Sequence, residues 1–184
     1  MHIDRLRLPE IVRLTPRRFG DDRGWFSETY NQRVVDHALG AEVRFVQDNH
    51  SRSAKGVLRG LHYQLPPHAQ GKLVRVLRGA VMDVAVDVRR RSASFGQWVA
   101  VELTEDNQAQ LWIPPGFAHG FLSLADGTEV LYKTTDFWAP AAERAIRWDD
   151  PELALPWPKD ITPRLAPKDA AAPPLASAEV FNEL

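Results

Sequence analysis

The stretches GVLRGLHYQLPPHAQGKLVRVLRG, residues 56–79, and PPGFAH, residues 114–119, decide the fold of this chain. In both, glycine or proline residues that favour tight turns stand beside short runs rich in branched apolar residues. Such runs recur between turn residues at positions 57–64, 73–78, 80–88, 98–103, 108–113 and 129–135. Short, evenly spaced strands joined by turns predict an all-β antiparallel jelly-roll barrel.

Residues 80–88 show the two-residue period of a β-strand, in which even-numbered and odd-numbered side chains lie on opposite faces. Outside the strands, residues 31–38 favour a short helix, and the proline- and alanine-rich region from Pro151 onward is expected to wrap or trail the barrel as loop with little helix. At 184 residues the chain is long enough for one well-buried domain and too short for two of ordinary size. We therefore expect a single domain over 1–184, with a barrel core at about 45–150.

Composition excludes several classes of function. A formal net charge of -1 gives no global basic field, so we expect no nucleic acid partner. The absence of cysteine excludes disulfides, thiolate nucleophiles and cysteine-based zinc sites. The sequence shows neither a signal peptide nor a membrane span, which predicts a soluble cytoplasmic protein with no membrane partner.

The spacing of glycine, histidine and proline in the two opening stretches resembles the paired motifs of cupin barrels. In metal-binding cupins the first motif supplies two histidines and a glutamate to a metal ion. Here His62 occupies the first histidine position, but Gln64 and Lys72 stand at the second histidine and the glutamate. An ammonium group has no lone pair for a metal and repels cations. We therefore expect no metal and no cofactor, with a lysine charge in place of the metal charge.

Two positions leave alternatives open. His62 is either a core residue or a base that faces the pocket, and the cupin register favours the pocket. Arg59 lies three residues earlier, which places it on the opposite face under strict alternation. A bulge at Gly60 would let both side chains point inward. His119 is expected at a strand start near the barrel mouth.

The motifs RGWFSE, QDNHS, KGVLRGLHYQ, IPPGFAHGF, LYKTTDFW and ERAIRWDDP, followed by the Lys-Asp pair at 168–169, resemble the dTDP-4-dehydrorhamnose 3,5-epimerase family over roughly residues 5–170. The resemblance implies that His62 is the proton acceptor, Tyr132 the proton donor and Asp169 the residue that orients His62. Lys72 and His119 would line the sugar site. Further substrate contacts implied by the resemblance are Arg23, Glu28, Gln47, Asp48, Asn49, Arg59, Glu143 and Lys168. Trp138 stands where the family usually has a tyrosine that stacks on thymine.

The implied reaction is a metal-free 3,5-epimerisation of dTDP-4-dehydro-6-deoxy-D-glucose in dTDP-L-rhamnose biosynthesis. The alternatives are an epimerase of one carbon or a ketoisomerase of a related nucleotide sugar, a metal-dependent cupin, and a binding module without catalysis. The long segment before Val57 could pair with the sheet of a second copy, and the family implies a homodimer.

Overall fold

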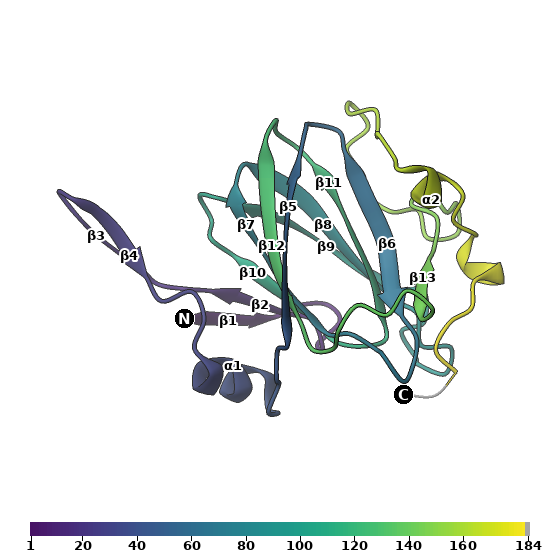
Figure 1. The fold of residues 1–184 in the computed structure, drawn as a ribbon, viewed down its shortest axis with the longest axis horizontal. Coiled ribbons are helices and arrows are strands. Elements are labelled where there is room, and N and C mark those ends of the chain that lie inside the picture. Colours follow the sequence, from purple (N-terminus) through teal and green to yellow (C-terminus); the bar gives the residue numbers. More distant parts are fainter. Residues whose placement is uncertain (183–184) are drawn as a thin grey trace.

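The computed structural model describes residues 1–182 and contains two large antiparallel sheets that face each other (Figure 1). The six-stranded sheet has the order β1 (His2–Arg5), β2 (Val12–Thr15), β10 (Gln110–Ile113), β7 (Lys72–Arg78), β12 (Thr128–Thr134) and β5 (Gln47–Ser53). The five-stranded sheet has the order β13 (Glu143–Ala145), β6 (Leu58–Gln64), β11 (Phe117–Ser123), β8 (Ala80–Asp87) and β9 (Trp98–Thr104). The predicted all-β antiparallel class is confirmed.

The main core lies between the sheets, and β8 shows why the alternating pattern is so clear. Val81 and Ala85 belong to the core cluster shared by both sheets. Val84 and Val86, on the other face of β8, pack in a second cluster with Phe181 and other residues of the C-terminal region. Full burial of each aliphatic side chain stabilises the fold by about 1.5–3 kcal/mol relative to its exposure to water. The C-terminal region therefore wraps the outer face of the five-stranded sheet and does not trail away.

Helices are few and lie at the periphery (Figure 1). The helix predicted over residues 31–38 is confirmed as α1 (Gln32–Leu39), which ends at Gly40 in the left-handed conformation. The C-terminal region holds one turn of helix, α2 (Pro167–Ala170), and a short 3₁₀ helix, η1 (Leu175–Ser177). None of the helices within residues 1–182 is long and apolar enough to cross a membrane.

A bulge at Gly60 resolves the conflict between Arg59 and His62. His62 pairs with His119, whereas Arg59 pairs with Phe121, so β6 holds one residue more than β11 between these two pairs. Gly60 has φ +120°, and a Cβ atom there would lie 2.5 Å from the Cα atom of Gly120. Only glycine fits this close crossing. Because of the bulge, His62 faces the interior, and the Arg59 side chain reaches Ser53 Oγ of the opposite sheet at 3.2 Å.

The N-terminal segment divides between the chain's own sheet and a projecting hairpin. β1 and β2 extend the six-stranded sheet through β10. The hairpin of β3 (Arg18–Asp21) and β4 (Gly24–Ser27) extends away from both sheets (Figure 1). Its side chains Phe19, Trp25 and Phe26 are 52%, 56% and 70% exposed. Hydrophobic side chains gathered on an isolated hairpin mark a surface that other protein atoms normally cover.

Candidate active site

A cavity opens between the two sheets at the end where β6, β7 and β12 meet the loop that carries Trp138. Its lining is mostly polar and comes from both sheets: Gln47, Asn49, His62, Tyr63, Gln64, Gln70, Lys72, Tyr132, Trp138 and Glu143. The strand register explains why these residues converge. Tyr132 pairs with Asn49 on β5, and Thr134 pairs with both Gln47 and Lys72, so their side chains share the inward face of the six-stranded sheet.

His62 and Asp169 form a hydrogen-bonded pair although 107 residues separate them. The distance from His62 Nε2 to Asp169 Oδ1 is 2.5 Å, and Asp169, the third residue of α2, is 2% exposed. Burial, the largest influence, raises the pKa of Asp169, but the hydrogen bond and electrostatic attraction to His62, with smaller contributions from Gly60 and Lys168, bring that pKa below its ordinary value. Asp169 is therefore a carboxylate that fixes the imidazole and stabilises it when it takes up a proton.

Lys72 is buried beside this pair. Its Nζ donates a hydrogen bond to the backbone carbonyl of His62 at 3.1 Å. Burial lowers the pKa of Lys72 to about 8, while the negative charges of Asp83 and Glu143 raise it. An ammonium group in a site shielded from water stabilises a nearby anion more strongly than one in solution.

Gln64, at the second ligand position of a metal cupin, makes three hydrogen bonds to the protein backbone through its side-chain amide. Its Nε2 donates to the carbonyls of His68 and Phe137, at 2.7 and 3.1 Å, and its Oε1 accepts from the backbone N–H of Ala139 at 2.8 Å. The side chain therefore anchors the loop around Trp138. Within residues 1–182, no group of three or more His, Cys, Asp or Glu residues is placed to hold a metal ion.

Tyr132 and His62 line the same cavity from opposite sheets, Tyr132 on β12 and His62 on β6. Burial raises the pKa of Tyr132, the positive charge of Arg59 lowers it, and the charge of Glu143 raises it, with a net increase. The phenol therefore keeps its proton at neutral pH. An acid and a base on opposite walls of one cavity are the arrangement that inversion at carbon requires.

Polar and aromatic side chains surround this centre. Gln47 donates to Asn49 Oδ1 at 2.9 Å and accepts from the backbone N–H of Trp138 at 3.1 Å. The indole of Trp138 is 60% exposed at the mouth, where a planar ring is able to stack on it. Lys168 pairs with Glu143 at 3.1 Å beside the cavity.

Seven of the expected site residues do not line the cavity in the described part of the chain: Arg23, Glu28, Asp48, Arg59, His119, Lys168 and Asp169. Lys168 and Asp169 still contact the lining residues Glu143 and His62. Asp48 lies on the outer face of β5 and pairs with Lys133 at 3.0 Å. Arg23 pairs with Asp21 at the hairpin, and Glu28 follows the hairpin and accepts from Asn31 at 3.2 Å. His119 is buried as the third residue of β11.

The expected position of His119 at a strand start was therefore wrong by two residues. β11 begins at Phe117, directly after the Pro-Pro-Gly turn, and it pairs with β6 on one side and β8 on the other. His119 lies inside the sheet for this reason, and its Nε2 lies 2.8 Å from the carboxylate of Asp83. Sequence reasoning missed Asp83, because the odd-numbered positions of residues 80–88 indicate its face but not its partner.

Comparisons with known proteins place the chain in a family. The family model described as dTDP-4-dehydrorhamnose 3,5-epimerase matches residues 5–177. A dTDP-4-dehydrorhamnose 3,5-epimerase of Pseudomonas aeruginosa is 57% identical over 181 residues, which cover 98% of this chain and 99% of the relative.

Two solved structures are informative. The dTDP-6-deoxy-D-glucose-3,5-epimerase of Legionella pneumophila, in complex with dTDP-4-keto-L-rhamnose, has a TM-score of 0.95 at 46% identity and covers 100% of this chain and 98% of its own. A 3'-monoepimerase from Streptomyces bikiniensis, in complex with dTDP-quinovose, has a TM-score of 0.89 at 35% identity and covers 94% of this chain and 87% of its own. With a family model that matches nearly its full length and a relative of this identity, the chain belongs to the dTDP-4-dehydrorhamnose 3,5-epimerase family.

Proposed function

We propose that this chain converts dTDP-4-dehydro-6-deoxy-D-glucose to dTDP-4-dehydro-L-rhamnose, a step of dTDP-L-rhamnose biosynthesis, by inverting C3 and C5 without a metal ion. The observation that carries the proposal is one cavity lined by His62, which is paired with Asp169, by Tyr132 from the opposite sheet and by the buried Lys72, whose Nζ donates to the backbone carbonyl of His62. A cytoplasmic location remains part of the proposal.

The chemistry follows from the carbonyl at C4. Both C3 and C5 are α to this carbonyl, so removal of the hydrogen at either carbon leaves an enolate with its negative charge on the C4 oxygen. His62 takes the proton, and its imidazolium is stabilised by Asp169. The Lys72 ammonium stabilises the oxyanion. Tyr132 then returns a proton to the carbon from the other face, and the site regains its protonation state by exchange with solvent.

The nucleotide would bind at the mouth of the cavity. We propose that Trp138 stacks on the thymine ring, and that Gln47 and Asn49, held together by their own hydrogen bond, contact the diphosphate or sugar. Arg59 and Lys168 add positive charge beside the cavity. Arginine suits this role because its planar fork matches phosphate oxygens.

We propose that the protein acts as a homodimer. Arg23 lies on a hairpin that extends away from its own cavity, with three exposed aromatic side chains around it. A second copy that covers this hairpin would bury those rings and bring Arg23 and Glu28 toward the partner's cavity. The expected mass in sedimentation or light scattering is that of two chains, and Phe26→Ser should shift it toward one. A monomeric wild type at working concentration would contradict this assembly.

The experiment that tests the reaction is product analysis in D2O. Incubation with dTDP-4-dehydro-6-deoxy-D-glucose should give a product with deuterium at both C3 and C5, read by NMR. His62→Asn should suppress exchange at both carbons, whereas Tyr132→Phe should permit abstraction but impair inversion. Label at one carbon only would favour a single-carbon epimerase, the activity named for the Streptomyces bikiniensis protein. A product without deuterium at either carbon would favour a module that binds the nucleotide sugar without catalysis.

A further inference from the structure

Residues 136–139, which we call the Trp138 segment, lie between β12 and β13 at the mouth of the cavity. Glutamine side chains from three other parts of the chain hold its backbone: Gln47 on β5, Gln64 on β6 and Gln70 in the loop between β6 and β7. All three glutamines line the cavity. The four hydrogen bonds join the Asp136 carbonyl to Gln70 at 2.8 Å, the Phe137 carbonyl to Gln64 at 3.1 Å, the Trp138 N–H to Gln47 at 3.1 Å and the Ala139 N–H to Gln64 at 2.8 Å.

Packing does little to fix the two rings that the segment carries. Phe137 and Trp138 are 61% and 60% exposed. A tryptophan side chain has only two torsion angles, so the place of an exposed indole depends mainly on the backbone that bears it. The glutamines hold that backbone, and they therefore set the place at which a planar ligand meets the indole of Trp138.

Gln64 connects the segment to the strand that carries the proposed base. It lies two residues after His62 on β6, and both side chains line the cavity from the same face of the strand. Gln64 is 3% exposed, and its Nε2 also donates to the carbonyl of His68 at 2.7 Å. A carboxamide carries a donor and an acceptor at one end, which suits the C=O and N–H groups that flank Trp138. The distance from the imidazole to the indole is therefore set through one short piece of strand.

We propose that Gln64 and Gln70 are positioning residues of the nucleobase site. They hold the indole of Trp138 at a fixed place relative to His62, so that a nucleotide stacked on the indole presents its sugar to the imidazole. This inference rests on the proposed function in one respect, the stacking of the nucleobase on Trp138. The attachment of the segment to the glutamines does not depend on it, and it is measurable in the protein without ligand.

Gln64→Met is the main variant, because methionine is a flexible side chain of similar size without the amide. Amide hydrogen exchange read by NMR should show the N–H of Ala139 exchanging about tenfold faster than in the wild type, the usual effect of one lost hydrogen bond. Calorimetry with dTDP should give a Kd about tenfold higher, as expected if the indole is in the competent position for about one tenth of the time.

A double-mutant cycle shows whether Gln64 acts through Trp138. Trp138→Ala removes the ring and should raise the Kd for dTDP by about 5- to 150-fold. In the Trp138→Ala background, Gln64→Met should have no further effect on that Kd, because the group that Gln64 positions is absent. A general structural role of Gln64, or its direct contact with dTDP, would give the same loss of affinity in both backgrounds.

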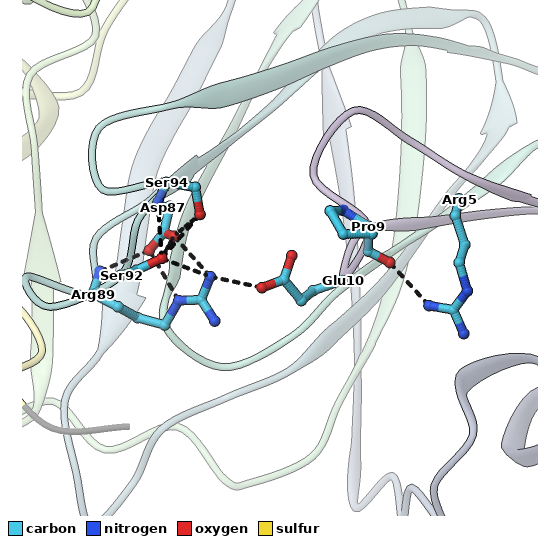
Figure 2. Close-up of polar contacts among 7 residues, drawn as sticks. All are labelled: Arg5, Pro9, Glu10, Asp87, Arg89, Ser92 and Ser94. Carbon is cyan, nitrogen blue, oxygen red and sulfur yellow. Dashed lines mark hydrogen bonds and ion pairs between the residues drawn. The ribbon is translucent and has the colours of Figure 1, made fainter.

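Asp87 provides the control, because it anchors a different loop. It is 0% exposed, does not line the cavity within residues 1–182, and accepts from Arg89, Ser92 and Ser94 on the loop that follows β8 (Figure 2). Asp87→Asn should lower the stability of the fold but leave the Kd for dTDP and the amide exchange of Ala139 as they are in the wild type.

A wild-type Kd in Gln64→Met, at a site that Trp138→Ala weakens, overturns the proposal, and so does an equal loss in both backgrounds or a raised Kd in Asp87→Asn. If Gln64→Met does not fold, Gln70→Met takes its place, because it removes only one of the four hydrogen bonds. Its Kd should rise by about threefold, and an unchanged Kd overturns the proposal.

Failure of the proposed function has a different signature. An unchanged Kd in Trp138→Ala removes the base site itself, and with it the role of both glutamines. Should the wild type exchange no protons with the substrate, the proposed reaction fails, whereas the cycle measured with dTDP still decides the role of Gln64.

Discussion

Replacement of Asp169 by asparagine tests the proposed base most directly. The change is nearly isosteric, and Asp169 does not line the cavity, so the affinity for substrate should change little. The substitution removes the negative charge of the carboxylate, which lies 2.5 Å from His62 Nε2. A hydrogen bond to a charged group contributes about 1.5–3 kcal/mol, which corresponds to a loss of about 10- to 150-fold in kcat. An amide also permits the wrong imidazole tautomer, and in serine proteases the same change costs about 10⁴.

We therefore expect kcat of Asp169→Asn to fall by about 10² to 10⁴, with KM nearly unchanged. The assay is the rate of deuterium incorporation at C3 and C5, compared with epimer formation. Asp150→Asn is the control, because Asp150 is also 2% exposed and holds the C-terminal region through the backbone N–H of Leu175 at 2.7 Å. It should lower stability without lowering kcat. A wild-type kcat in Asp169→Asn, or an effect on KM alone, would refute the assignment.

The same pair predicts a dependence of stability on pH. The pKa of Asp169 is lower in the folded protein than its ordinary value of 3.8. A carboxyl group of this kind stabilises the fold at pH values above its unfolded pKa, and the contribution is lost as the pH falls through the folded pKa. The difference in unfolding free energy between the wild type and Asp169→Asn should therefore be largest near neutral pH and shrink below about pH 4. Denaturation by urea at several pH values measures it.

Four further outcomes are expected. Lys72→Ala should lower kcat more than it raises KM, by about 3 kcal/mol of transition-state stabilisation, and EDTA should leave the wild-type rate unchanged; loss of activity restored by a divalent ion would show a metal enzyme. Trp138→Ala should weaken dTDP binding by roughly 1–3 kcal/mol in calorimetry, and an unchanged Kd would remove Trp138 from the base site. Gly60→Ala should destabilise the fold by roughly 2–6 kcal/mol, through strain and the 2.5 Å approach to Gly120, whereas Gly20→Ala, whose Cβ would meet its nearest atom at 3.6 Å, should be nearly neutral.

The barrel strands were predictable because their environment is regular. The side chains of residues 80–88 point alternately to two buried faces. This two-residue period is visible in the sequence, and the stretch forms β8 in the structure. β3 and β4 escaped prediction because their residues are largely exposed on both faces, so no apolar period marks them. β13 has three residues, too few for any period. Register was also beyond the sequence: the bulge at Gly60 was one of two alternatives until the pairing of β6 with β11 decided it.

The site was predictable to the extent that its residues lie inside motifs. His62 and Lys72 are separated by a short, recognisable spacing, and the substituted ligand positions indicate their chemistry. Asp169 reaches His62 only because the C-terminal region wraps the five-stranded sheet, a contact between residues that no local pattern relates. Asp83 belongs to none of the motifs quoted above, and its partner His119 is apparent only from the structure, in which β11 pairs with β8.

Lys72 stands where a metal cupin has its glutamate, and, against the larger effect of burial, the charges of two carboxylates, Asp83 and Glu143, raise its pKa. A divalent cation keeps its charge at any physiological pH, whereas an ammonium group in a buried site tends to lose its proton, and burial brings the pKa of Lys72 down to about 8. Such a site works only if nearby anions hold the proton on the lysine, yet those anions must not neutralise the field at the oxyanion. Glu143 is partly neutralised by Lys168 at the cavity rim, and Asp83 lies behind His119 in the interior. We therefore expect the Lys72 ammonium, whose Nζ donates to the backbone carbonyl of His62, to act on the enolate oxygen of the proposed reaction while these carboxylates favour its charged form.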